Sequence, residues 1–225
     1  VSNSKTMSGS VNLLGGKNSL TNSGSVGTDF SYFSYSGGSG DDTVSNSLTG
    51  TMSGGVAVGS GNNSLTNAGF IGKGQSDRSY HADYGSLADK VTNSGTMDGA
   101  IYVGGGVNTI TNTGSVGKDS SNRSVDAGDQ DDTVSNSKTM AGSVYLGGGK
   151  NSLTNSGSVG KDFTGFSYSG GSGDDTISNT LSGIMSGGIE VRDGNNSLTN
   201  VGFIGKGQGD RSYYADYSVF ADKVT

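Results

Sequence analysis

Two glycine- and aspartate-rich segments contain the residues best suited to binding a ligand. Residues 37–44 read GGSGDDTV, and residues 170–177 read GGSGDDTI. Their glycines allow tight turns, and each segment ends in two adjacent aspartates, the second of which is Asp42 or Asp175. We favour a structural turn for both segments.

Residues for catalysis are scarce. His81 is the single histidine, and the related segment further along the chain has Tyr214 in its place, so we expect an exposed loop residue. Glu190 is the single glutamate and lies beside Arg192 and Asp193. Solenoid enzymes that cleave polysaccharides do use carboxylate clusters on a strand face. Because only one unit carries such a cluster, we predict no enzyme, no catalytic residue and no cofactor.

Aromatic residues gather in the variable segments of the chain, such as FSYFSYSGG at residues 30–38. In the interpretation we favour, alternate rings fill the core and the others cover it. The alternative is an exposed surface that stacks against glycans or against a neighbouring rod. The candidate residues for this interaction surface are Tyr32, Tyr35, Tyr80, Tyr84, Tyr168, Tyr213 and Tyr217.

The composition excludes several classes of partner. The net charge is −6 and the 14 Lys and Arg residues are scattered, which argues against nucleic acid and against an anionic membrane surface. The sequence contains no long apolar run, so we expect no direct insertion into a membrane. The chain has 43 Gly and no Cys or Pro, so disulfides and thiolate metal sites are excluded. The lack of Cys also suits an exported protein.

A recurring asparagine indicates how the chain is organised. It follows an aliphatic residue by two positions, as in VSNS and LTNS, and returns after 19 to 26 residues. A unit this short cannot bury its apolar face alone, so successive units must stack. We expect the asparagines to form a ladder inside one corner, with surface turns as the alternative. The ladder comprises Asn3, Asn22, Asn46, Asn67, Asn93, Asn112, Asn136, Asn155, Asn179 and Asn200.

The repeats predict an all-β fold, a parallel β-helix of about ten coils. Two coils form a unit of 43 or 47 residues, which divides a single continuous solenoid into residues 1–43, 44–90, 91–133, 134–176 and 177–223. A 133-residue super-repeat joins Val1 to Val134, and we expect a window of a longer array. Apolar residues alternate from Met7 to Leu13, which predicts one strand there. Asn and Asp alternate two residues before each aliphatic, from Asn18 to Asp222, which predicts a second ladder with spaced charges.

The repeated N-S-G-x-[MV]-x-G texture resembles the β-helical passenger regions of bacterial autotransporters and related surface adhesins. Segments 37–44 and 170–177 are similar to the nonapeptides of repeats-in-toxin proteins, whose aspartates and loop carbonyls hold Ca²⁺. This second resemblance implies calcium binding by Asp42 and Asp175, as the alternative to the structural turn that we favour. The first resemblance implies export to the bacterial cell surface and a structural or adhesive role in a stalk, surface layer or filament. We expect the chain to associate with itself, end to end or laterally, or alternatively to bind surface glycans.

Overall fold

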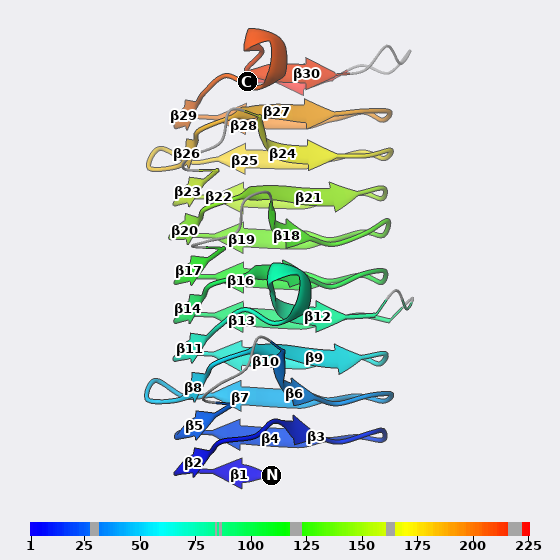
Figure 1. Ribbon diagram of the computed structural model, residues 1–225. Coiled ribbons are helices and arrows are strands. Elements are labelled where there is room, and N and C mark those ends of the chain that lie inside the picture. The colour runs from blue at the N-terminus through cyan, green and yellow to red at the C-terminus, as the bar shows by residue number, and fades with distance from the viewer. Residues whose placement is uncertain (28–31, 84, 86, 118–122, 161–164, 216–221) are drawn as a thin grey trace.

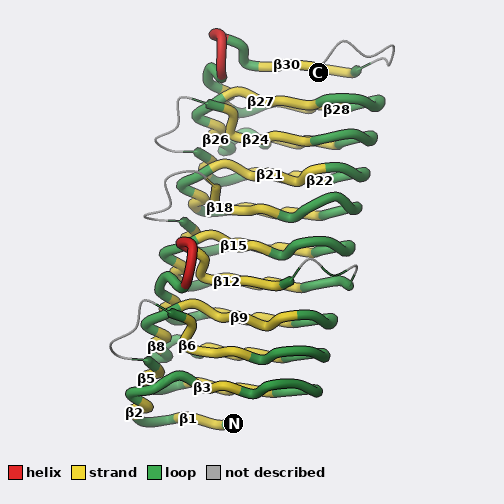
Figure 2. The backbone as a smooth tube through the Cα atoms, turned by 45° about the vertical axis from the view of Figure 1, so that its right-hand side comes forward, coloured by secondary structure: helices red, strands yellow, loops and turns green. Residues whose placement is uncertain are grey.

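Three parallel β-sheets run the height of the molecule and enclose one core (Figure 1). The computed structural model describes residues 1–27, 32–83, 85, 87–117, 123–160, 165–215 and 222–225. The chain passes through sheets A, B and C in turn, and one such passage is called a coil. The sheets contain 11, 10 and 10 strands, so the predicted parallel β-helix of about ten coils is confirmed. The two termini lie at opposite ends of the stack (Figure 2).

Sheet A contains the longest regular ladder. Its strands are β1 (Ser2–Asn3), β4 (Ser19–Asn22), β7 (Thr43–Asn46), β10 (Ser64–Asn67), β13 (Lys90–Asn93), β16 (Thr109–Asn112), β19 (Thr133–Asn136), β22 (Ser152–Asn155), β25 (Thr176–Asn179), β28 (Ser197–Asn200) and β31 (Lys223–Val224). The aliphatic and Asn side chains of each strand point inward. The outward positions are Ser or Thr in nearly every coil, so this face is a pair of hydroxyl columns.

Sheet B is built from two-residue strands. They are β2 (Thr6–Met7), β5 (Ser25–Val26), β8 (Thr51–Met52), β11 (Phe70–Ile71), β14 (Thr96–Met97), β17 (Ser115–Val116), β20 (Thr139–Met140), β23 (Ser158–Val159), β26 (Ile184–Met185) and β29 (Phe203–Ile204). The five methionines point inward in alternate coils, between Val or Ile of the coils on either side.

Sheet C has the most varied sequence. Its strands are β3 (Val11–Asn12), β6 (Phe33–Ser36), β9 (Gly55–Gly59), β12 (Arg78–Ala82), β15 (Ala100–Tyr102), β18 (Arg123–Asp126), β21 (Ser143–Gly147), β24 (Phe166–Gly170), β27 (Gly188–Val191) and β30 (Tyr213–Ala215). Two 3₁₀ turns, η1 (Gln75–Asp77) and η2 (Gln208–Asp210), precede β12 and β30. No helix in the described part of the chain combines the length and apolar character needed to cross a membrane.

The prediction of one strand from Met7 to Leu13 is wrong, because the chain turns a corner within it. Thr6–Met7 belongs to sheet B and Val11–Asn12 to sheet C. In later coils glycine occupies this corner because the backbone of the neighbouring coil leaves no room for a side chain, whereas Gly9 in the first coil has open space around it. A Cβ at Gly54 would lie 1.8 Å from the carbonyl oxygen of Tyr32, and one at Gly99 would lie 2.3 Å from that of Asp77.

The predicted asparagine ladder is confirmed, and the alternative of surface turns is wrong. Each Asn side chain donates from Nδ2 to Oδ1 of the Asn in the next coil, at 2.8 to 2.9 Å for all nine steps. The same Nδ2 groups also donate to backbone carbonyls; Asn112, for example, contacts Gly114 O at 3.1 Å. The amides therefore satisfy the turn between sheets A and B, and they are almost fully buried.

Replacing one asparagine of this ladder should destabilise the whole rod. Asn112→Ala removes the contacts to Asn93 and Asn136, leaves the buried Oδ1 of Asn136 without its donor and ends the hydrogen bonds from Asn112 to the turn. We expect the free energy of unfolding to fall by about 2–4 kcal/mol, measured by denaturant titration. The control is Asn12→Ala, an exposed asparagine of sheet C, which should change stability by less than about 0.5 kcal/mol. Equal effects of the two variants would contradict the ladder's role.

A column of glycines leads into sheet B and offers a second test of coil spacing. A Cβ at Gly95 would lie 2.1 Å from the carbonyl oxygen of Gly69, directly beneath it. Gly95→Ala should therefore lower the free energy of unfolding by at least about 2 kcal/mol. Gly9→Ala, where no atom lies within 4 Å of the added Cβ, is the matched control and should be close to neutral in thermal unfolding. Tolerance of alanine at both positions would contradict the stacking distance.

Candidate functional site

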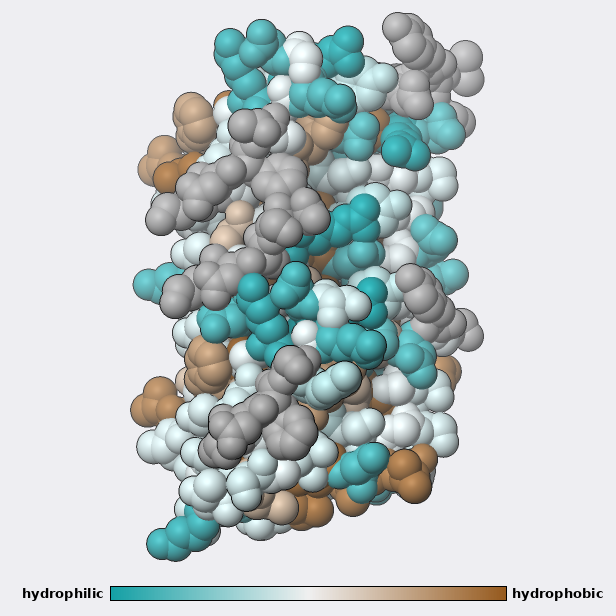
Figure 3. Space-filling view, in the orientation of Figure 1, coloured by the Kyte–Doolittle hydropathy of each residue, from teal (hydrophilic) through white to brown (hydrophobic). Residues whose placement is uncertain are grey.

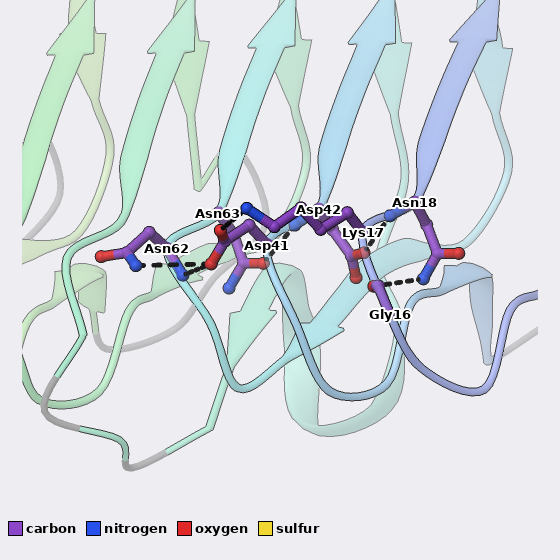
Figure 4. Close-up of polar contacts among 7 residues, drawn as sticks. All are labelled: Gly16, Lys17, Asn18, Asp41, Asp42, Asn62 and Asn63. Atoms are coloured by element: carbon purple, nitrogen blue, oxygen red, sulfur yellow. Dashed lines mark hydrogen bonds and ion pairs between the residues drawn. The ribbon is translucent and has the colours of Figure 1, made fainter.

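Asp42 and Asp175, the candidate calcium ligands, lie at the corner between sheets C and A. Both are buried, and each accepts a backbone N–H of the preceding coil on Oδ1, from Asn18 and Asn151 respectively, at 3.0 Å. Figure 4 shows how Asp42 in turn donates its own N–H to Oδ1 of Asn63, at 2.9 Å. This second ladder continues as predicted through Asn18, Asp42, Asn63, Asp89, Asn108, Asp132, Asn151, Asp175, Asn196 and Asp222.

The second ladder spaces the carboxylates apart instead of gathering them. An Asn separates each Asp from the next, so buried carboxylates recur every second coil, about 10 Å apart. Within the described ranges, no group of three or more His, Cys, Asp or Glu side chains is placed to hold a metal ion. The exposed neighbour Asp41 instead pairs with Lys17 at 2.9 Å (Figure 4). This geometry favours the structural turn over calcium binding.

Several of the tyrosines expected on an interaction surface belong to the core, so the expectation is wrong for them. Tyr35, Tyr80 and Tyr168 have no exposed surface, because their positions in β6, β12 and β24 point inward. Tyr213 is half-buried, and its hydroxyl donates to Asp222 Oδ2 at 2.8 Å. Tyr32 is 61% exposed. Tyr84 and Tyr217 lie outside the described residues.

The buried tyrosines share the core with the carboxylates of the second ladder. Burial and the neighbouring Asp89 raise the pKa of Tyr80 well above its usual value, and burial and Asp175 do the same to Tyr168. Burial is also the main cause that raises the pKa of Asp89 and of Asp175 to about 6. Each of these two tyrosine hydroxyls therefore lies near a carboxyl group whose raised pKa favours the protonated carboxylic acid.

Asp132 is the carboxylate without such a tyrosine. We number the coils from β1–β3, the first, to β28–β30, the tenth. In the sixth coil, the strand of sheet C before Asp132 has Val125 at the inward position. The other even-numbered coils have a tyrosine there: Tyr35, Tyr80, Tyr168 and Tyr213. Asp132 has no exposed surface, and its Oδ2, like that of Asp42 and Asp175, has no hydrogen-bond partner among the described residues. Burial raises the pKa of this carboxyl to about 7, against hydrogen bonds from Asn108 that lower it.

Stability should therefore fall as the pH rises from about 4 to about 7. The unfolded Asp132 carboxyl loses its proton near pH 4, whereas the folded protein keeps it to about pH 7, so the folded state binds more protons over this range. Asp132→Asn keeps an uncharged side chain at every pH. We expect it to raise the free energy of unfolding at pH 8 by about 1–3 kcal/mol and to flatten the pH dependence.

The control for this test is Asp193→Asn, which alters an exposed carboxylate. It should leave the slope of stability against pH as it is in the unmodified protein. The measurement is urea unfolding at a series of pH values between 4 and 8. An unchanged slope in Asp132→Asn would contradict the account of this buried carboxyl.

A groove crosses the outward face of sheet C. It has a volume of about 690 Å³ and extends from η1 across β12, β15, β18, β21, β24 and β27. Its floor includes Tyr102, Tyr145 and Phe166, with Arg78 and Arg123 above the tyrosines. Figure 3 shows hydrophilic side chains gathered at this height, from about β12 to β21.

Arginine and tyrosine stack in a repeated arrangement along this groove. The guanidinium of Arg78 lies 3.9 Å from the centroid of the Tyr102 ring in the following coil. The guanidinium of Arg123 lies 4.0 Å from that of Tyr145, again one coil further on. Arg211 makes a looser contact with Tyr214, at 4.6 Å. Such stacking holds a guanidinium flat and leaves its edge free to donate hydrogen bonds.

Asp126 and Glu190, two carboxylates of the groove, are too far apart to act as a catalytic pair. Asp126 pairs with Arg123 at 2.6 Å, and Glu190 accepts a hydrogen bond from Ser169 at 2.7 Å. The register places Asp126 three coils from Glu190, about 14 Å. Glycoside hydrolases need two carboxyl groups within roughly 10 Å. Arg192 also lines the groove near Glu190, but Asp193 does not.

His81 is not an exposed loop residue, so that expectation is wrong. It lies in β12, half-buried between Phe33 and Tyr102, with ring centroids 5.8 and 5.4 Å away. Burial lowers the pKa of His81, and the charge of Arg78 lowers it further. His81 therefore packs as a neutral aromatic ring between Phe33 and Tyr102.

Comparisons with protein-family models, with curated proteins and with solved structures give no match to this chain.

The arginines and the tyrosines beneath them were missed in the sequence, although a signal for the arginines is present. The variable segments align on a Ser that precedes the inward-facing residue of sheet C. The residue before that Ser is always large, Phe or Arg, and lies on the outward side. The aligned triplets are FSY at 33–35, RSY at 78–80, RSV at 123–125, FSY at 166–168 and RSY at 211–213.

Proposed function

We propose that this chain is a structural and adhesive segment of an extracellular bacterial β-solenoid. One observation carries the proposal: every coil offers the next the same asparagine amide and the same strand register. Each coil of such a rod contacts only its neighbours, so further units can be added with the same contacts. The resemblance of its repeats to autotransporter passenger regions supports display at the cell surface in a stalk, surface layer or filament.

Exposed leucines support lateral association with a second copy. Leu48 and Leu181 are 82% and 85% exposed and occupy the same position in the two 133-residue super-repeats. Phe203 and Ile184 lie exposed near Leu181, and Phe70 is half-buried near Leu48. Figure 3 shows the resulting hydrophobic patches at one edge, beside β8 and β26. Two such patches on one rigid rod would bind a second rod at two points.

Removing both leucines should weaken this association. We expect Leu48→Ser with Leu181→Ser to raise the dimer dissociation constant at least about tenfold, because each exposed leucine that is covered contributes hydrophobic free energy. Sedimentation velocity over a concentration series measures the change. Leu14→Ser is the matched control, since Leu14 is also 85% exposed but has Gly147 at its super-repeat position. A double variant that associates like the unmodified chain would contradict lateral contact at these patches.

The groove on sheet C favours a second candidate function, the binding of glycans. It combines aromatic rings, guanidinium donors and carboxylate acceptors on rigid strands, which is the chemistry that sugar hydroxyls and sugar faces require. We assign it binding and not catalysis, because Asp126 and Glu190 lie three coils apart. Titration with neutral and acidic oligosaccharides tests this function, and lack of binding to any of them would contradict it.

A further inference from the structure

The groove owes its shape to an alternation of residue size along one column of sheet C. In even-numbered coils this column holds Phe33, Arg78, Arg123, Phe166 and Arg211. In the odd-numbered coils between them it holds small residues: Gly55, Ala100, Ser143 and Gly188. Each large side chain can therefore lean over the following coil. Arg78 and Arg123 present two guanidiniums in the same orientation, two coils or about 10 Å apart.

The two guanidiniums keep hydrogen-bonding capacity for a ligand. No ion pair among the described residues involves Arg78, whose guanidinium lies over the Tyr102 ring. Arg123 uses its Nη1 for Asp126, and its remaining N–H groups make no ion pair with any residue that the structure describes. A guanidinium held on an aromatic ring loses little side-chain entropy when it binds, and it can contact a carboxylate or sulfate through two parallel hydrogen bonds.

The charge of the groove limits which anions it can accept. Three arginines and three carboxylates line it, so their charges cancel. The arginines are Arg78, Arg123 and Arg192, and the carboxylates are Asp77, Asp126 and Glu190. The chain as a whole carries −6. A polymer with a negative charge on every unit would also place a charge between Arg78 and Arg123, where the lining residues are Ala100 and Tyr102 and offer no cation to meet it. A polymer charged at every second unit would meet Arg78 and Arg123 and place uncharged units between them.

We propose that the groove binds a linear acidic polysaccharide that carries one carboxylate or sulfate per disaccharide and lies along the solenoid axis. Two coils match the length of about two sugar units in an extended chain. Arg78 and Arg123 take successive acidic groups, Asp126 and Glu190 accept hydrogen bonds from sugar hydroxyls, and Phe166 offers its ring to a sugar face. This assignment rests on the glycan-binding function proposed above and names its substrate class.

Calorimetric titration with four probes of similar length tests the assignment. They are a hyaluronan decasaccharide with one carboxylate per disaccharide, an oligogalacturonate with one on every sugar, neutral dextran oligosaccharides and oligothymidylate. We expect hyaluronan to bind at least about tenfold more tightly than each of the others, and to weaken as salt is raised. Arg78→Gln and Arg123→Gln should each lower its affinity about tenfold, the size of a charge-assisted hydrogen bond.

Two controls separate this site from general charge effects. Lys150→Gln removes the same charge from an exposed corner outside the groove and should leave affinity unchanged. Arg78→Lys keeps the charge but not the planar, two-pronged donor, so it should restore little binding. Circular dichroism confirms that each variant keeps its strands.

The outcomes distinguish this proposal from the function beneath it. Dextran binding as tightly as hyaluronan, or arginine variants that bind like the unmodified chain, would overturn the acidic class while leaving glycan binding intact. Failure of all three glycans would overturn both proposals. Tighter binding of oligothymidylate or oligogalacturonate than of hyaluronan would overturn the argument from charge spacing.

Discussion

The hydrogen bond between asparagine side chains of successive coils is the interaction on which this structure depends. Each amide uses its nitrogen for the next rung and for a backbone carbonyl, and its oxygen for the previous rung. A coil displaced by one residue would break every one of these contacts at a buried corner. The amides therefore fix the register of sheet A, and through it the heights of sheets B and C.

A fixed register explains why variation is confined to particular places. Insertions of up to seven residues between asparagines occur at corners and in the segments before sheet C, while the four-residue strands of sheet A stay constant. The Asn and Asp residues of the second ladder hold the opposite corner by accepting backbone N–H groups. With two corners held, the outward face of sheet C is free to carry Arg, Tyr and Phe. In the column that contains Arg78 and Arg123, large residues alternate with small ones from coil to coil, so each arginine can reach the Tyr of the following coil.

The fold could be predicted from the sequence because its determinants are local and repeated. Three features recur at the same place in each repeat: the ladder asparagines from Asn3 to Asn200, the five methionines, and the alternation of Asn and Asp that begins with Asn18 and Asp42. Their spacing alone predicts that the coils stack. The site could not be predicted in the same way. Whether Tyr80 points inward and Arg78 outward depends on a bulge between them in β12, which shifts the register against Ala100 and Ile101. Burial of Tyr35 and Tyr168 follows from the same kind of irregularity. The corner between Met7 and Val11 could not be predicted either, because its glycine fits the alternating pattern of a single strand.

Hydrogen exchange of the asparagine side-chain amides, followed by nuclear magnetic resonance, tests the central claim most directly. If the ladder holds the coils in register, the Nδ2 protons of Asn93, Asn112 and Asn136 should exchange only when the whole protein unfolds, and therefore slowly. The exposed amides of Asn12 and Asn62 should exchange at once. Ladder amides that exchange as fast as those of Asn12 would show that the column is not held together by these hydrogen bonds.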